Sequence, residues 1–381
     1  MRNLKIAWVS PSMGFGFYIQ PVLKELVRIF PNFKVFTARW PGYISSCENL
    51  FPVEVIGKYQ RLNRKGSESE YDRAFQKLSL TIIPKLLVYK PEVIFITGFS
   101  LWSLLVTLFK FLGRWKVILI YSGSSPSIDV LDSPWRIKLR KIIASGVDAF
   151  VTNSQGGKQY LISGLGIQKE KIFARPYQIP DQRDLLANPP EGGIDLDILQ
   201  RPSFLFVGQT VERKGLSTLL EACLLLKQDG YENFSLVIVG DGAQRQQYEV
   251  WTIEHNLTDQ VHWVGWIAYS SLGFYYQQVN AFIFPTFEDI WGMVVLEAML
   301  FSNAILCSKE AGVKELIKAG YNGQVFNPHS PEEIARTMQS IIDNPELSVS
   351  MGELSRKEIE WHTPEAAAEN FEKIIEFVAT K

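Results

Sequence analysis

Cysteine is scarce in this chain, and its scarcity excludes two kinds of architecture. The 381 residues contain three cysteines, Cys47, Cys223 and Cys307, which are far apart in the sequence. An odd number of separated cysteines without metal-ligand spacing argues against a disulfide framework and against a zinc site. The sequence therefore predicts a protein of a reducing compartment.

Long apolar runs are also lacking. The only stretch of near-membrane length, residues 101–121, is interrupted by Lys110, Arg114 and Lys116, and Gly113 divides it into a helix-like and a strand-like half. We interpret it as a buried helix followed by a strand. The first ten residues show no small-residue cleavage pattern, so a cytoplasmic location is expected.

Net charge is almost absent from the whole chain, at −1, but not from its halves. Residues 1–180 contain 25 Lys and Arg against 11 Asp and Glu, a net charge of +14, and the remaining residues contain 14 against 29, a net charge of −15. This asymmetry predicts an anionic surface beside the first half, either nucleic acid or a membrane leaflet, unless the two halves simply attract each other. A nucleic-acid partner is not expected, because no recognised binding module is present.

Strand-like and helix-like segments alternate along the chain, which is typical of parallel α/β sheets. Proline, glycine and acidic residues gather in residues 181–202, the predicted linker. We expect Rossmann-like domains over residues 1–180 and 203–360 with a ligand cleft between them. Residues 361–381 form the expected amphipathic C-terminal helix.

The first chemical signal is the segment FLFVGQTVERKG. A strand is predicted to end at Gly208, and Arg213 and Lys214 come just before a predicted helix. Loop amides, a helix N-terminus and two cations together make an anion site that suits a diphosphate. The alternative is a solvated basic pair at the start of a helix.

The second signal is the segment FIFPTFEDIWGMVVLEAML. Asp289 lies before a predicted helix and Glu297 two turns inside it, where each carboxylate can accept hydrogen bonds from vicinal hydroxyls of a sugar or a ribose. Gly292 lets the backbone approach a ligand, and the amides of Met293 and Val294 are expected at the helix N-terminus, where a phosphate binds. The alternatives are that Asp289 caps the helix and that Glu297 is a hydrogen-bonded interior residue.

With these motifs the chain resembles the GT-B glycosyltransferases, specifically the retaining family 4, or glycosyl transferases group 1. The resemblance extends nearly end to end and includes VIVGDGAQRQQYE, SKEAGVKELIKAGYNGQVF and the final helix, which in the family crosses back to the N-terminal domain. It implies an α/β fold of two Rossmann-like domains facing each other across a cleft. The basic N-terminal domain would take the acceptor and the acidic C-terminal domain the nucleotide-sugar donor.

The resemblance implies roles for the charged residues by position. Lys214 would stabilise the donor diphosphate, Glu297 would hold the ribose hydroxyls, and Asp289 would contact the transferred sugar. Asp289 stands where the family has a glutamate, and the adjacent Glu288 competes for that role. The arginine that the family usually has after Val-Gly is Gln209 here, so the second cation would come from Arg213 or from elsewhere.

The resemblance also places backbone and apolar residues at the donor. Gly16, Gly208 and Gly240 lie in its glycine loops, and Gly16 would let the N-terminal loop approach the phosphate or the acceptor. Trp266 and Ile267 fall where the family's backbone meets the nucleobase, although Trp266 fits core packing equally well.

One departure from the family lies in the N-terminal half. All four histidines are in the C-terminal half, so the N-terminal histidine of many relatives is missing. The segment YSGSSPS stands in its place, and Ser122 and Ser124 are the polar candidates there.

The implied activity is transfer of a sugar from a nucleotide-diphosphate-sugar to a hydroxyl acceptor with retention of configuration, without a metal or another cofactor. A lipid or lipid-linked glycan is a candidate acceptor. The alternatives are a catalytically silent glycan- or lipid-binding GT-B protein and a GT-B phosphorylase or epimerase.

Two groups of cations predict peripheral attachment to the cytoplasmic face of an anionic membrane. They are Arg61, Arg64 and Lys65 in one polar loop, and Arg136, Lys138, Arg140 and Lys141 on a predicted helix.

Overall fold

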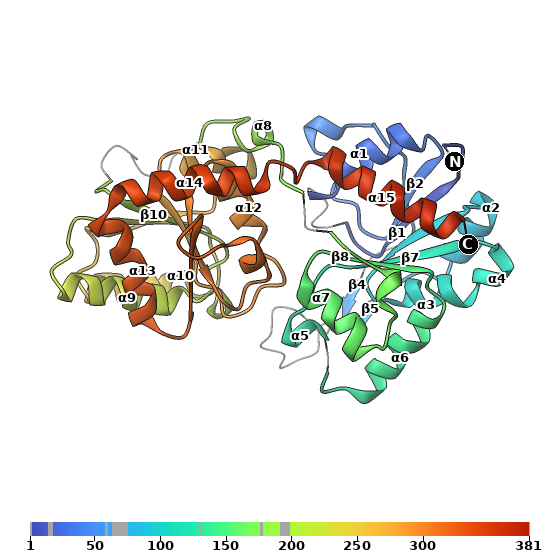
Figure 1. The fold of residues 1–381 in the computed structure, drawn as a ribbon, viewed down its shortest axis with the longest axis horizontal. Helices are drawn as coiled ribbons and strands as arrows, with labels where there is room; N and C mark the ends of the chain where they lie inside the picture. Colours follow the sequence, from blue (N-terminus) through green and yellow to red (C-terminus); the bar gives the residue numbers. More distant parts are fainter. Residues whose placement is uncertain are drawn as a thin grey trace. The chain divides into compact units, whose positions relative to one another are not determined.

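The computed structural model describes residues 2–13, 18–57, 60–62, 75–129, 131–175, 178–190 and 199–380. The chain divides into two compact units (Figure 1). Unit 1 comprises Met1–Gln178 and His362–Lys381, and unit 2 comprises Ile179–Trp361. Among the described residues, no helix combines the length and the apolar character needed to cross a membrane.

Unit 1 is built on a parallel sheet with the strand order β3-β2-β1-β6-β7-β8-β9. Its strands are β1 (Ile6–Ser10), β2 (Phe33–Thr37), β3 (Val53–Val55), β6 (Val93–Thr97), β7 (Lys116–Tyr121), β8 (Ala149–Thr152) and β9 (Ile172–Ala174), and β4 (Gln60–Leu62) and β5 (Phe75–Lys77) form a separate antiparallel pair. All five residues of β1 are buried, as expected for a central strand that is covered on both faces.

Helices cover both faces of this sheet. They are α1 (Gln20–Ile29), α2 (Ile82–Tyr89), α3 (Leu101–Leu108), α4 (Lys110–Gly113), α5 (Pro126–Asp129), α6 (Pro134–Ser145), α7 (Gln155–Gln159) and α15 (Pro364–Ala379), with short turns at Ser45–Cys47 (η2), Tyr160–Gly164 (η3) and Lys169–Lys171 (η4). Helices α1 and α15 pack side by side over one core, whereas α2, α3 and α6 enclose the other. The predicted C-terminal helix thus completes unit 1, because Phe371 packs edge-on against Trp8 and Phe95.

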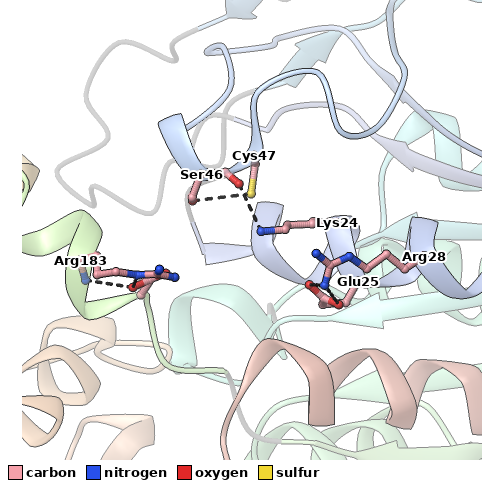
Figure 2. A network of polar contacts seen from close by, with 7 residues as sticks. Lys24, Glu25, Arg28, Ser46, Cys47 and Arg183 are labelled. Carbon is pink, nitrogen blue, oxygen red and sulfur yellow. Dashed lines mark hydrogen bonds and ion pairs between the residues drawn. The ribbon is translucent and has the colours of Figure 1, made fainter.

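Polar contacts hold α1 to the turn that follows β2 (Figure 2). Lys24 donates to the backbone oxygen of Ser46 over 3.4 Å, and Glu25 pairs with Arg28 at 2.8 Å along the helix. The same figure shows Arg183, which pairs with Asp181 at 2.6 Å at the start of unit 2. These pairs are exposed and contribute about 0–1 kcal/mol each, so the apolar faces dominate the stability of the fold.

Unit 2 is a second parallel sheet, with the order β12-β11-β10-β13-β14-β15. Its strands are β10 (Ser203–Val207), β11 (Ser235–Val239), β12 (Val261–Gly265), β13 (Ala281–Phe284), β14 (Ala304–Ser308) and β15 (Gly323–Phe326). Its helices and turns are α8 (Gln182–Leu185), η6 (Glu212–Lys214), α9 (Leu216–Gln228), α10 (Arg245–Glu254), η7 (Tyr269–Ser271), α11 (Leu272–Gln277), α12 (Met293–Leu300), η8 (Gly312–Leu316), α13 (Pro331–Asp343) and α14 (Pro345–Ile359). The central strands β10 and β13 pair directly and in parallel. The loops that follow their carboxyl ends carry the two predicted motifs, which are therefore brought together.

Candidate functional site

The loop after β10 is attached to the loop after β13 by backbone contacts. The carbonyl oxygen of Arg213 accepts from the amide of Phe287 at 2.8 Å and from the Thr286 hydroxyl at 3.0 Å. Gly215 has φ +67°, and a Cβ there would lie 2.0 Å from the carbonyl oxygen of Pro285. Only glycine fits this close approach without displacing the backbone, so the position of Arg213 and Lys214 depends on it.

A cluster of two cations and one carboxylate lies at this junction. Lys214 Nζ is 2.7 Å from Asp289 Oδ2, and Arg213 Nη1 is 3.5 Å from the same oxygen. The Lys214 and Asp289 side chains are each 13% exposed, so water screens their attraction less than it would at the surface. The structure therefore joins the diphosphate cation and the sugar carboxylate that the sequence assigned to separate motifs.

Backbone groups complete this cluster. Asp289 Oδ1 accepts from the amide of Trp291 at 3.1 Å, and Arg213 Nη1 donates to the backbone oxygen of Glu288 at 2.8 Å. Asp289 precedes the helix, as expected, but it does not cap it, because Trp291 lies before the N-cap Gly292 and no described side chain caps α12. Asp289 Oδ2 thus lies within 3.5 Å of both cations, and the competing role of the adjacent Glu288 stays a prediction.

Helix α12 begins where the sequence predicted. Gly292 is its N-cap with φ +102°, and a Cβ there would lie 2.7 Å from the Phe284 ring. Met293 and Val294 are the first two helical residues, whose amides have no acceptor in a preceding turn of the helix.

Glu297 lies inside unit 2. It is 1% exposed, and its Oε2 accepts from the Tyr276 hydroxyl at 2.9 Å. The contact supports the interpretation of Glu297 as a hydrogen-bonded interior carboxylate, and its role toward a ribose stays a prediction. Sequence reasoning missed Tyr276, which lies on α11 and also donates to the Val294 carbonyl at 3.3 Å. No spacing rule connects these residues, which are 21 positions apart.

Three neighbouring strands end in closely packed glycines. The Gly208 amide donates to Val239 over 3.0 Å and the Gly240 amide to Gly265 over 2.8 Å. Gly240 has φ +137°, and a Cβ there would lie 1.8 Å from the carbonyl oxygen of Gly208. These glycines let the backbones of the strand ends approach one another closely at the carboxyl edge of the sheet, where ligands of α/β folds bind.

Trp266 follows this edge and is 74% exposed, so the structure rules out the interpretation of Trp266 as a core residue. Its neighbour Ile267 is half-buried. An indole exposed beside the strand ends offers an aromatic face to a ligand.

The predicted N-terminal site is described only in part. Gly16 and its loop lie outside the described residues. Ser122 is exposed, whereas Ser124 and Tyr121 both donate to the carboxylate of Asp129, a buried residue on α5 that sequence reasoning missed. Burial and the neighbouring Asp129 carboxylate raise the pKa of Tyr121 far above its usual value, so its hydroxyl stays protonated and keeps donating.

The described part of the chain contains no group of three or more His, Cys, Asp or Glu side chains that could hold a metal ion. The expectation of a reaction without metal stays a prediction.

Residues 196–358 match the family model of the glycosyl transferases group 1. The chain is 24% identical over 216 residues to an "Uncharacterized glycosyltransferase" of Methanocaldococcus jannaschii, a match that covers 55% of this chain and 60% of that protein. It is 29% identical over 153 residues to the alpha-D-kanosaminyltransferase of Streptomyces kanamyceticus, covering 40% of this chain and 39% of that protein. The matches thus span between 39% and 60% of the length of these relatives.

The fold extends over the whole chain. The crystal structure of Anabaena HepE in complex with UDP aligns with 99% of this chain and 100% of its own, with a TM-score of 0.73 and 15% identity. The GT-B fold inferred from the motifs is therefore confirmed, and residues 196–358 match the glycosyl transferases group 1 family that the motifs resemble.

Proposed function

We propose that the protein is a glycosyltransferase that moves a sugar from a nucleotide-diphosphate-sugar to a hydroxyl acceptor with retention of configuration. The observation that carries this proposal is the cluster of Lys214, Arg213 and Asp289 at the carboxyl ends of β10 and β13. It combines a site for a diphosphate with a carboxylate for sugar hydroxyls, inside a domain of a glycosyltransferase family.

The cations act on the leaving group. Negative charge develops on the diphosphate as the glycosidic bond breaks, and a fixed cation 4 Å away stabilises it by about 4 kcal/mol at an effective dielectric of 20, before desolvation. Because Lys214 and Arg213 supply this charge, the proposed reaction needs no metal. Asp289 holds Lys214 in place until the diphosphate competes for it, and its carboxylate is then available to the sugar hydroxyls.

Turnover of a nucleotide-sugar panel by the Lys214→Ala variant tests this assignment. We expect kcat/KM to fall roughly 10- to 1000-fold, equivalent to about 1.4 to 4 kcal/mol. Lys318→Ala is the matched control, because Lys318 pairs with Glu358 at 2.6 Å on the surface of the same unit. A Lys214→Ala variant that turns over donors as fast as the wild type would contradict the assignment. A wild-type protein that binds donors without transferring or hydrolysing them would favour the catalytically silent alternative.

We also propose that unit 1 contacts an anionic membrane and that the acceptor is a lipid or a lipid-linked glycan. Helices α3, α4 and α6 carry exposed apolar side chains, among them Phe111 at 90% and Trp135 at 56% exposure. Lys138 and Lys141 on α6 are exposed beside them, and each cation near an anionic surface contributes about 1 kcal/mol. Arg140 differs from expectation, because its guanidinium donates inward to the carbonyls of Ile128 and Asp129. The other predicted basic loop is largely outside the described residues.

Flotation with vesicles of neutral and anionic phospholipid tests the membrane contact. Binding should rise with anionic lipid, fall with added salt, and be lost in a Lys138→Glu, Lys141→Glu variant. Binding that is indifferent to lipid charge or to these substitutions would refute the contact.

A further inference from the structure

A cavity of about 640 Å³ lies within unit 1, at the carboxyl ends of β1 and β6. Helices α3 and α6, which pack against each other, form its sides. Its lining includes Ser10 and Thr97 at the strand ends, and Leu101, Leu104, Trp135, Arg136 and Arg140 on the two helices. The volume lies in the range of small-molecule sites, and the donor cluster belongs to the other unit.

The cavity has a buried end and an exposed end. Ser10, at the sheet edge, is buried, whereas Leu101 and Trp135 are 40% and 56% exposed. The hydroxyls at the buried end are committed to one another, since Thr97 donates to Ser10 at 2.9 Å and Ser10 donates to the Ser12 carbonyl at 2.9 Å. The strand ends therefore offer acceptors but few hydrogen-bond donors to a ligand.

The positive charge comes from two arginines of α6. Arg140 makes its hydrogen bonds to neutral oxygens, which are the carbonyls of Ile128 and Asp129 and the Tyr160 hydroxyl. Within the described residues Arg136 has no ion pair, and its guanidinium lies 5.3 Å from the Trp135 ring centroid. Neither guanidinium is hydrogen-bonded to a carboxylate of the described residues, but the carboxylate of Asp129 lies near Arg140, so Arg136 is the less compensated charge that an anion in the cavity would meet.

The lining also indicates what the cavity does not suit. Its described residues include no Asp, Glu, Asn, Gln or His, the side chains that bind the hydroxyls of a free sugar in pairs. Most of its other residues are apolar, and their hydrophobic surface favours a hydrocarbon chain.

We propose that this cavity binds the lipid phosphate part of an amphipathic acceptor, in which a phosphate joins a hydrocarbon chain to a hydroxyl-bearing group, with Arg136 as the main phosphate ligand and Leu101 and Leu104 against the chain. The proposal deepens the proposed function and rests on it, because the bound molecule is an acceptor only if the protein is a glycosyltransferase. Helices α3 and α6 line the cavity and also carry exposed apolar residues. A hydrocarbon chain anchored in a bilayer would therefore enter the cavity at its exposed end, between these helices.

Calorimetric titration of the full chain with n-decyl phosphate, without donor, tests the proposal. We expect saturable binding to the wild type and at least tenfold weaker binding to Arg136→Gln and to Leu101→Trp, which fills the cavity. Lys169→Gln and Leu108→Trp are the matched controls, because they alter exposed residues of the same unit outside the lining and should bind like the wild type. Thermal melts identify any variant that has lost its fold.

Two further titrations measure how much the phosphate and the hydrocarbon chain each contribute to binding. Inorganic phosphate alone and n-decanol alone should bind at least tenfold more weakly than n-decyl phosphate. The proposal is overturned if phosphate alone binds as well as n-decyl phosphate, if folded Leu101→Trp keeps wild-type affinity, or if Lys169→Gln loses as much affinity as Arg136→Gln. Failure of the donor assignment would appear in Lys214→Ala turnover and leave this titration unchanged, so the two failures are distinguishable.

Discussion

An Asp289→Asn variant removes the negative charge of the cation cluster while keeping a side chain of nearly the same shape. The amide oxygen can still accept from the Trp291 amide, which Asp289 does at 3.1 Å. At an effective dielectric of 20, the lost attractions are about 6 kcal/mol for Lys214 at 2.7 Å and about 5 kcal/mol for Arg213 at 3.5 Å. These values are upper bounds, because the freed cations regain interactions with water.

The substitution should move binding and turnover in opposite directions. A nucleoside diphosphate no longer competes with Asp289 for Lys214, so its affinity should rise at least about tenfold, equivalent to about 1.4 kcal/mol. Transfer should fall at least about tenfold, since the carboxylate that would contact the sugar is gone. Without ligand the two cations repel each other, and the variant should melt at a lower temperature than the wild type.

Calorimetry with the nucleoside diphosphate that the donor panel selects measures the affinity, and a coupled transfer assay measures turnover. Glu358→Gln is the control, because it removes a carboxylate from Lys318 at 2.6 Å in the same unit without touching the cluster. An unchanged or weaker diphosphate affinity in Asp289→Asn would refute the reasoning, even if turnover were lost.

Other residues give sharp expectations. Tyr276→Phe removes the hydroxyl that donates to Glu297 at 2.9 Å. If Glu297 holds the ribose equally in the ground and transition states, steady-state kinetics should show the donor KM rising by a larger factor than kcat falls. Gly215→Ala should lower the free energy of unfolding, measured with urea, by more than the roughly 1 kcal/mol expected of the control Gly230→Ala. Both glycines have positive φ, but only at Gly215 does a backbone oxygen lie 2.0 Å from the new Cβ. Burial lowers the pKa of His262, so the unfolded chain binds its proton at higher pH than the folded chain does. Stability should therefore fall as the pH drops below about 6.5, and a folded His262→Asn variant whose melting temperature fell as steeply would contradict this.

The sequence predicted the alternation of strands and helices well, because buried parallel strands are continuous apolar runs and glycine or proline marks their ends. The segments at Gly208 and Gly292 begin and end close to their expected positions for this reason. What the sequence could not predict is which side chains meet. Lys214 and Asp289 are 75 residues apart, and they touch only because β10 pairs with β13.

The same limit applies to Arg140. A helical pattern suggests which side chains share a face, but it does not reveal that carbonyls of the preceding segment accept from this guanidinium. Likewise, Tyr276 has no signal in the sequence, because a buried tyrosine is usually a packing residue and its polar partner depends on tertiary structure.

The position of α15 has a consequence for the synthesis of the protein. Residues 179–361 form unit 2 as one continuous segment, whereas unit 1 needs His362–Lys381, which a ribosome adds only after all of unit 2. The second unit can therefore fold before the first is complete, which reverses the usual order from the N-terminus. Until Phe371 arrives, Trp8 and Phe95 lack the ring that packs against them. A chain that ends before α15 would combine an intact unit 2 with an incomplete unit 1 whose aromatic surface is exposed, the kind of species that chaperones bind and that aggregates.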